Sequence, residues 1–206
     1  MSPSGVPDII VGRLPIYLRE LTKMAEEGKE ITSSQELGKR LGISSTQIRK
    51  DLSQFGEFGK QGTGYDLDFL IMQLQLILKV EDVWDVVLVG AGDLGHAIAN
   101  YGGFTDRGFR RNLIFDNDPN KIGQQVGSYT IKDVSSLVKD IRARNIRVAM
   151  LAVPTVDAQA VTDRLIEAGI KAILCYSQTS ISVPEGVKVE YIDPILHLQH
   201  MTYYLP

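Results

Sequence analysis

The chain has 206 residues with a formal net charge of −3, 44% hydrophobic residues and 23% charged residues. The length fits one large domain or, more comfortably, a small domain plus a medium-sized one. The composition is that of an ordinary soluble globular protein. There is no apolar run of the roughly 18 residues that would span a membrane, and MSPSGVPDIIVG at the start lacks the segments of a signal peptide, so we expect a cytoplasmic protein with no membrane partner.

Three helices are predicted in the N-terminal part. The first lies within RLPIYLRELTKMAEEG, 13–28, where leucines recur at helical spacing and Pro15 suits only a first turn. Ser33 and Ser44 then each precede a Glu or Gln by three residues, which is the pattern of a capping box. A short helix ending at Gly42 is therefore followed at once by another, and such a pair makes a helix-turn-helix.

The third helix has one apolar and one polar face. Ile48, Leu52 and Phe55 lie within about 60° of each other on a helical wheel. The opposite side carries amides, hydroxyls and cations, and residues 39–64 hold five Lys/Arg against two acids. Such a face suits a DNA major groove, where amides and cations contact base edges and phosphates. The expected DNA-binding residues on this helix are Ser45, Thr46, Gln47, Arg49, Lys50, Ser53 and Gln54.

A glycine-rich segment follows, with glycines at 56, 59, 62 and 64 and with Lys60 and Gln61 at its tip. Glycines permit tight turns and close approach, so the segment predicts a wing, and Lys60 and Gln61 are expected to contact an adjacent minor groove. The alternative is that the polar helix face is merely solvated and that the hairpin is an ordinary glycine-rich one.

The next segments predict a change of architecture. LDFLIMQLQLIL, 67–78, is apolar around much of a helix and predicts a helix packed between two bodies, with a domain boundary near residue 80. Beyond it apolar strands alternate with amphipathic helices, which predicts an α/β domain with a doubly wound parallel sheet covered on both faces. The lone Cys175 lies in the apolar run 170–176, so we expect a buried structural thiol and no metal site.

The segment VVLVGAGDLGHAIANY, 86–101, reads as strand, tight turn and helix, with Gly90, Gly92 and Gly95 in the spacing GxGxxG. The first glycine allows the turn, the second lets a pyrophosphate approach the backbone, and the third permits close helix packing. Asp116 ends the next strand, 26 residues after Gly90. An acid there accepts ribose hydroxyls and repels a 2′-phosphate, which favours NAD over NADP. A Rossmann-type domain that has lost its ligand is the alternative.

An enzyme is not expected. No substrate domain follows residue 176, and none of the three histidines lies on an evident catalytic loop. The C-terminal PILHLQHMTYYL, 194–205, predicts an amphipathic helix that covers its own domain or docks on a partner subunit.

From end to end, the chain resembles the Rex family of redox-sensing transcriptional repressors. The joined motifs QIRKDLS and FGEFGK are highly specific to that family, whereas the dinucleotide turn is not. The other motifs that carry the resemblance are RLPIYLREL, SSQELGKRLGISST, VLVGAGDLGHAIANYGGF, FDNDPNKIG, VPTVDAQAVTDRLIEAGIKAIL and VPEGVKVEYID.

The resemblance implies a homodimer with a winged-helix DNA-binding domain at 1–80, a Rossmann NAD(H)-binding domain at 81–192, and a C-terminal helix at 193–206 exchanged between subunits. It further implies that palindromic operator DNA is held when NAD⁺ dominates and released when NADH binds. A polar interdomain switch falls on Arg19, Tyr101 and Asp193. The implied cofactor-binding residues are Gly90, Ala91, Gly92, Asp93, Leu94, Gly95, Asp116, Val153 and Pro154.

One residue of the glycine motif favours a variant of this function. Asp93 lies at the helix start where a pyrophosphate is expected, and two anions there cost about 1 kcal/mol or more. The alternatives are that Asp93 is an ordinary helix cap, or that the chain is a Rex-like regulator with weaker sensing, another adenine-containing ligand such as CoA, or no ligand. A small NAD-dependent oxidoreductase is a further alternative, but it leaves the helix-turn-helix unexplained.

Overall fold

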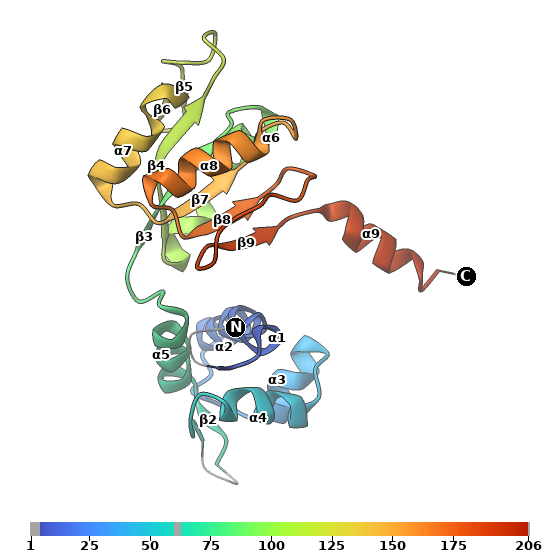
Figure 1. Ribbon diagram of the computed structural model, residues 1–206. Coiled ribbons are helices and arrows are strands. Elements are labelled where there is room, and N and C mark those ends of the chain that lie inside the picture. The colour runs from blue at the N-terminus through green and yellow to red at the C-terminus, as the bar shows by residue number, and fades with distance from the viewer. Residues whose placement is uncertain (1–4, 60–62, 206) are drawn as a thin grey trace. The chain divides into compact units, whose positions relative to one another are not determined.

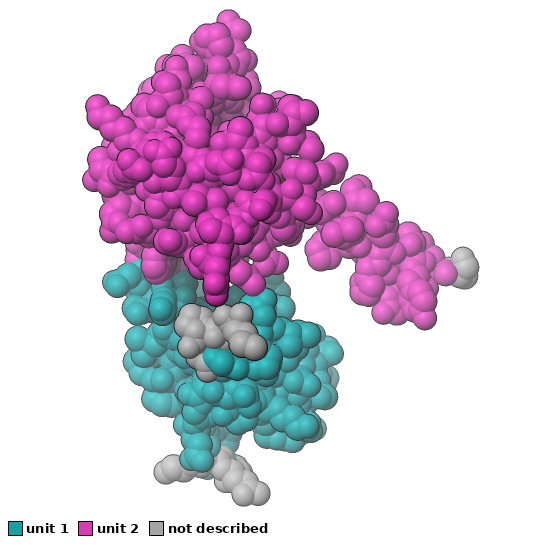
Figure 2. Space-filling view, in the orientation of Figure 1, with its two compact units in different colours: residues 1–82 teal, residues 83–206 magenta. Residues whose placement is uncertain are grey.

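A computed structural model describes residues 5–59 and 63–205. The predicted wing residues Lys60 and Gln61 lie outside them. The chain divides into two compact units, Met1–Asp82 and Val83–Pro206, which Figure 2 shows in different colours. Each unit has its own hydrophobic core.

The first unit is mainly helical. Both predicted serine caps are present, because the Ser33 Oγ accepts from the Glu36 backbone N–H at 3.1 Å and the Ser44 Oγ from the Gln47 N–H at 3.2 Å. The helices are α1 (Asp8–Val11), α2 (Leu14–Glu26), α3 (Ser34–Leu41), α4 (Ser45–Ser53) and α5 (Leu67–Leu78). Two short antiparallel strands, β1 (Ile31–Thr32) and β2 (Tyr65–Asp66), complete the unit.

The core of this unit lies among α2, α3, α4 and α5. Tyr17 and Leu21 of α2, Leu37 of α3 and Ile48 of α4 are fully buried. Helix α5 buries Leu67, Leu70 and Leu74 in the same core and leaves Phe69, Met72 and Leu76 exposed. The predicted placement of α5 between two bodies stays a prediction.

The second unit contains a seven-stranded sheet in the order β5-β6-β4-β3-β7-β8-β9. All neighbouring strands are parallel except β5 and β6. The strands are β3 (Trp84–Val89), β4 (Phe109–Asp116), β5 (Gln125–Val126), β6 (Tyr129–Asp133), β7 (Val148–Leu151), β8 (Ala172–Cys175) and β9 (Lys188–Tyr191). The helical segments are α6 (Asp93–Asn100), η1 (Gly102–Arg107), η2 (Val134–Ser136), α7 (Leu137–Arg144), α8 (Ala158–Ala168) and α9 (Pro194–Thr202).

Alternate residues of β3 enter two different cores. Val87 and Val89 belong to one core with residues of α7 and α8, whereas Val86 and Leu88 belong to another with residues of α6. Figure 1 shows these helices beside the sheet. Burial on both faces explains why the central strands are apolar throughout. The predicted doubly wound sheet is thus confirmed, and Cys175 is a buried thiol in the core that contains α8, as expected.

The strand order positions a ligand site. Strand β3 lies between β4 and β7, and the chain runs from β3 to β4 on one side and returns through β7 on the other. At such a switch point the loops at the carboxyl ends diverge and leave a crevice.

Candidate functional site

The turn between α3 and α4 depends on two glycines. Gly42 ends α3 in the left-handed conformation, with φ of +68°. Gly38 lies within α3, and a Cβ there would come within 2.4 Å of the Ile43 carbonyl oxygen. The lack of side chains at both positions therefore allows α4 to fold back closely on α3 as a helix-turn-helix.

Most of the predicted DNA-binding residues of α4 are exposed. Thr46, Arg49, Lys50 and Ser53 are exposed on it, as is Gln54 just after it, and Ser45 and Gln47 are half-buried. The Arg49 guanidinium donates to the Ser34 Oγ at 3.0 Å and to the Thr46 Oγ1 at 3.2 Å. Arg49 of α4 is thereby linked to the first residue of α3.

A buried carboxylate lies behind this surface. Asp51 of α4 is fully buried, and we call Arg13, Tyr17, Gln47 and Asp51 the Asp51 cluster. Asp51 Oδ2 accepts from Arg13 Nε and from the Tyr17 hydroxyl, both at 2.6 Å. Asp51 Oδ1 accepts from Arg13 Nη2 and from Gln47 Nε2, both at 2.7 Å.

Opposing effects act on the pKa of Asp51. Burial raises this pKa, but the hydrogen bonds from Arg13, Tyr17 and Gln47 favour the charged form and outweigh burial, so the pKa lies below its ordinary value. Burial and the bond to Asp51 raise the pKa of Tyr17. The carboxylate therefore stays charged and the phenol neutral at physiological pH.

From the sequence, Asp51 was counted only as one of two acids in a basic stretch, and its burial was not predicted. A signal was available, because Asp51 falls about 60° from Ile48 on the helical wheel and therefore on the buried side. A charged residue at such a position requires partners. The partners Arg13 and Tyr17 lie more than 30 residues away in sequence, so only the tertiary structure identifies them.

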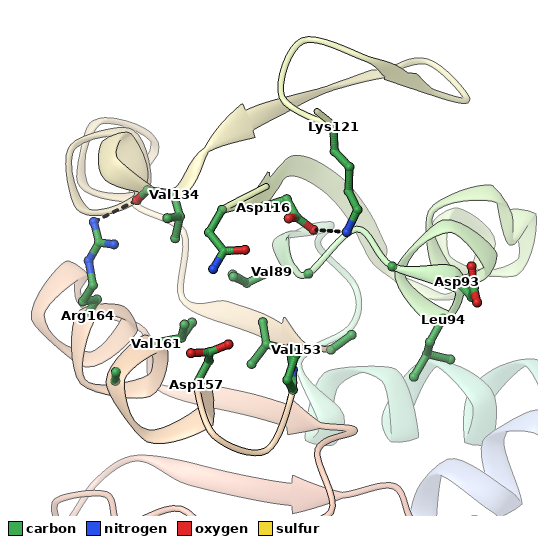
Figure 3. Close-up of a pocket in the computed structure, with 16 residues that line it drawn as sticks. Val89, Asp93, Leu94, Asp116, Lys121, Val134, Val153, Asp157, Val161 and Arg164 are labelled. Atoms are coloured by element: carbon green, nitrogen blue, oxygen red, sulfur yellow. Dashed lines mark hydrogen bonds and ion pairs between the residues drawn. The ribbon is translucent and has the colours of Figure 1, made fainter. Parts of the chain in front are cut away.

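A cavity of about 430 Å³ lies at the carboxyl ends of the central strands of the second unit (Figure 3). Seven of the nine predicted cofactor-binding residues line it, and they are Gly90, Gly92, Asp93, Leu94, Asp116, Val153 and Pro154. The remaining two, Ala91 and Gly95, lie behind the cavity wall and are buried.

Each glycine of the motif has a distinct structural reason. Gly90 has φ of +100°, and a Cβ there would come within 2.2 Å of the Ala152 carbonyl oxygen. A Cβ on Gly95 would come within 2.0 Å of the Gly90 carbonyl oxygen, so helix and turn are in close contact. A Cβ on Gly92 would meet nothing within 4 Å, and this open space is where a ligand can approach the backbone.

Asp116 braces the glycine turn. Its Oδ2 accepts from the Ala91 N–H at 2.7 Å and from Lys121 Nζ at 3.3 Å, and its Oδ1 accepts from the Asp118 N–H at 2.9 Å. Burial raises the pKa of Asp116, but these donors lower it below the ordinary value. A carboxylate has about four acceptor sites, so about one is left for a ribose hydroxyl rather than the two that the sequence interpretation expected.

Asp93 is the first residue of α6 and is exposed. Gly92 is the N-cap residue, and no side chain caps the helix, so Asp93 does not have the capping role that the alternative interpretation gave it. Figure 3 shows Asp93 and Leu94 on the side of the cavity opposite Arg164.

The rest of the cavity lining was missed from the sequence. Arg164 of α8 donates through Nη2 to the Val134 carbonyl at 2.8 Å, which joins two segments of the wall. Most of the missed residues follow the carboxyl ends of β4, β6 and β7. Ligands bind at these ends in such sheets, so their position after a predicted strand could have identified them as lining residues. The missed residues are Val89, Asn117, Lys121, Val134, Ala152, Asp157, Ala160, Val161 and Arg164.

The three predicted switch residues belong to different units of the chain, and their role as a switch stays a prediction. Arg19 is exposed on α2 of the first unit, and Tyr101 is exposed after α6 of the second unit. Asp193 caps α9 by accepting from the Ile195 N–H at 2.9 Å, and no residue of α9 is buried.

Within residues 5–59 and 63–205, no group of three or more His, Cys, Asp or Glu side chains is placed to hold a metal ion. None of the helices in the same ranges is long and apolar enough to cross a membrane.

A helix-turn-helix unit joined to a Rossmann-type unit with a nucleotide-sized cavity defines a ligand-responsive DNA-binding regulator. Two family models match the chain: "Putative DNA-binding protein N-terminus" at residues 5–53 and "CoA binding domain" at residues 81–179. A redox-sensing transcriptional repressor Rex from Chloroflexus aggregans is 50% identical over 199 residues, covering 97% of this chain and 94% of the relative. Rex from Brevibacillus brevis is 44% identical over 200 residues and covers 97% of both chains. The chain belongs to the Rex family.

Solved structures agree with this assignment. The crystal structure of RSP in complex with beta-NAD⁺ and operator DNA matches with a TM-score of 0.92 and 36% identity, covering 97% of this chain and 92% of that one. RSP in complex with beta-NADH matches with a TM-score of 0.89 and 33% identity, covering 98% and 94%. The relatives are repressors of transcription, so the expectation of a regulator rather than an enzyme is confirmed.

Proposed function

We propose that this chain is a transcriptional repressor that binds palindromic operator DNA through α4 and is released when NADH binds in the cavity of the second unit. The observation that carries the proposal is the match over 97% of the chain to a Rex-family repressor solved with both NAD⁺ and operator DNA. The helix-turn-helix and the glycine cradle described above supply the corresponding parts.

The DNA-binding part uses the exposed side of α4. Arg49 and Lys50 are the cations that would meet phosphates, and the amides and hydroxyls beside them would meet base edges. Lys60 and Gln61 belong to the proposed wing. The affinity for DNA should then fall steeply with salt, because phosphate contacts release counterions.

The chemistry of the cavity fits a dinucleotide. The open space at Gly92 and the backbone N–H groups that begin α6 suit a pyrophosphate. Asp116 can accept from a ribose hydroxyl, and Val134, Val153 and Val161 provide apolar walls (Figure 3). Reduced nicotinamide is neutral and oxidised nicotinamide is cationic, so an apolar surrounding favours NADH by desolvation.

The assembly and the domain plan are part of the same proposal. We infer a cytoplasmic homodimer with a DNA-binding domain at 1–80, a nucleotide-binding domain at 81–192 and a C-terminal segment at 193–206 exchanged between subunits. The exposed apolar residues Ile195, Leu196 and Leu198 of α9 support the exchange. Arg19, Tyr101 and Asp193 would form the polar switch between domains of the dimer.

The switch operates through linked equilibria. A ligand changes DNA affinity only by binding one arrangement of the dimer better than another. If NADH favours an arrangement whose paired α4 helices no longer match successive major grooves, about 34 Å apart, DNA weakens NADH binding by the same factor.

The test is a DNA-binding titration of the full chain with a palindromic duplex selected from a randomised pool. Saturating NADH should weaken binding at least tenfold, and the same concentration of NAD⁺ should have a smaller effect. Equal affinity with and without NADH would contradict the sensing part of the proposal, and failure to select any duplex would contradict the DNA-binding part.

A second candidate function has specific support. Asp93 is exposed, lines the cavity and begins α6, so its charge opposes a pyrophosphate there. Together with the match to the "CoA binding domain" model, this favours a Rex-type repressor with weakened NADH sensing or with another adenine-containing ligand.

Calorimetry on Asp93→Asn decides between the two candidates. If the carboxylate opposes the nucleotide, the variant binds NADH about five- to tenfold more tightly, which corresponds to about 1 kcal/mol. Binding that is unchanged or weaker removes the second candidate. Thermal shifts of the unmodified chain with NADH, NAD⁺, NADPH and CoA would identify a different adenine-containing ligand.

A further inference from the structure

The orientation of one amide on the DNA-facing helix is imposed by a buried charge. Gln47 Nε2 lies 2.7 Å from Asp51 Oδ1. A carboxylate only accepts hydrogen bonds, so the Gln47 amide must turn its nitrogen toward Asp51. The assignment of nitrogen and oxygen in this amide therefore follows from chemistry.

Asp51 itself has little freedom to move. The Arg13 guanidinium donates to both of its oxygens, and the Tyr17 hydroxyl donates to Oδ2. These donors come from the start of α2 and from its second turn, while Gln47 precedes Asp51 by one turn of α4. The carboxylate is thus fixed in the core, and it fixes the Gln47 amide in turn.

The carbonyl end of the same amide is available. No hydrogen bond to Gln47 Oε1 occurs within residues 5–59 and 63–205, and the side chain is half-buried. Gln47 is the third residue of α4. In helix-turn-helix proteins the N-terminal residues of the second helix contact base edges.

We propose that Gln47 recognises an exocyclic amine in the major groove, adenine N6 or cytosine N4, through Oε1, and that the Asp51 cluster holds the amide in this orientation. The inference rests on the proposed DNA binding and adds a rule for sequence preference. In the major groove these amines are the hydrogen-bond donors of the bases, whereas guanine O6 and N7 and thymine O4 are acceptors.

Gln54 provides a matched control. It is the C-cap residue of α4, is exposed, and has the same side chain as Gln47. Among the described residues the side-chain amide of Gln54 makes no hydrogen bond, so this amide can present either its oxygen or its nitrogen to DNA.

The experiment uses the full chain and the duplex that it selects from a randomised pool. In each half-site, every adenine is replaced singly by purine, which lacks the N6 amine, and every cytosine by pyrimidin-2-one, which lacks the N4 amine. Every guanine is likewise replaced by 7-deazaguanine, which lacks the N7 acceptor. Binding is measured for the unmodified chain, Gln47→Met and Gln54→Met. Comparing proteins on the same duplex cancels the effect of each analogue on duplex stability.

At one position of each half-site, loss of the amine should weaken binding of the unmodified chain about three- to tenfold, the range for one hydrogen bond. Gln47→Met should bind the analogue and the natural duplex equally. Gln54→Met should retain the full sensitivity at this position, whatever its effect on overall affinity. Gln47→Ala serves as a second variant. Both substitutions leave three donors on Asp51, so the fold of the unit should persist.

Other outcomes overturn the inference. It is wrong if no amine removal weakens the unmodified chain, or if Gln47→Met and Gln47→Ala keep the sensitivity. It is also wrong if the Gln47 variants lose sensitivity only to 7-deazaguanine, because Gln47 would then present its nitrogen to an acceptor. A chain that selects no duplex at all overturns the proposed DNA binding itself, and the inference with it.

Discussion

Each unit of the molecule contains a buried aspartate with several hydrogen-bond donors, and the two aspartates use them differently. Asp51 in the first unit is fully buried, and its donors are the side chains of Arg13, Tyr17 and Gln47. Asp116 in the second unit is 7% exposed, and two of its three donors are backbone N–H groups in adjacent turns.

This difference means that Asp51 stabilises the packing of helices, whereas Asp116 shapes the candidate ligand site. The donors of Asp51 come from two helices, so this carboxylate joins α2 to α4. Asp116 instead shapes the glycine turn and lines the cavity beside it. Buried charge thus orients α4 in one unit and the glycine turn in the other.

The largest expected effect comes from removing the first carboxylate. Asp51→Ala should destabilise the first unit by about 3 kcal/mol, because Arg13 loses its buried partner and the cluster loses its acceptor. Hydrogen exchange of the α2 and α4 amides measures this loss. Fluorescence of Trp84, the chain's single tryptophan, follows the second unit. Glu26→Ala, on the exposed side of α2, is the control and should change stability by less than about 0.5 kcal/mol. Equal hydrogen-exchange protection of the α2 and α4 amides in Asp51→Ala and Glu26→Ala would contradict the packing role of Asp51.

Two glycines in or next to the turn beside Asp116 should affect different properties when they are substituted, one the stability of the unit and the other the binding of NADH. Gly95→Ala should destabilise the second unit by about 2 kcal/mol, because the new Cβ would come within 2.0 Å of the Gly90 carbonyl oxygen. Gly92→Ala should leave stability within about 0.5 kcal/mol and weaken NADH binding, because its Cβ enters open space. Trp84 fluorescence during denaturation and calorimetry with NADH measure the two effects. Tight NADH binding by Gly92→Ala would place the nucleotide elsewhere.

Acid pH should weaken both units through these carboxylates. The pKa values of Asp51 and Asp116 lie below their ordinary value of 3.8. A lowered pKa in the folded state gives stability that is present above about pH 4 and is lost as pH falls through the folded value. The destabilisation caused by Asp51→Asn or Asp116→Asn should therefore be larger at pH 7 than at pH 3. A penalty that stays constant across this range would mean that the charge of the carboxylate contributes nothing.

The smallest expected effect concerns an exposed cation of α4 that forms an ion pair with neither carboxylate among the described residues. Lys50 is exposed, and its removal in Lys50→Ala should leave the unfolding free energy within about 0.5 kcal/mol. The slope of log affinity against log salt concentration should fall by about 1, as expected for one phosphate contact. Titrations of the selected duplex at several salt concentrations measure the slope. An unchanged slope would remove Lys50 from the phosphate-contacting set.

Sequence patterns were informative where structure depends on neighbouring residues. The serine caps at 33 and 44 and the glycines at 90, 92 and 95 have the positions that their spacing predicted. The same reasoning missed β6, because Tyr129–Asp133 is a short strand with several polar residues. It also missed Arg164, because that residue lines the cavity from a helix far along the chain.

The sequence by itself determined the helix-turn-helix, the parallel sheet and the nucleotide-binding turn, because caps, periodicity and glycine spacing act over a few residues. Only the tertiary structure decided that Asp51 is buried against Arg13 and Tyr17, and that Lys121 lies beside Asp116 at the cavity. The physical reason is that a charge enters a core only where distant parts of the chain bring donors to it. The meeting of those donors is a property of the folded chain.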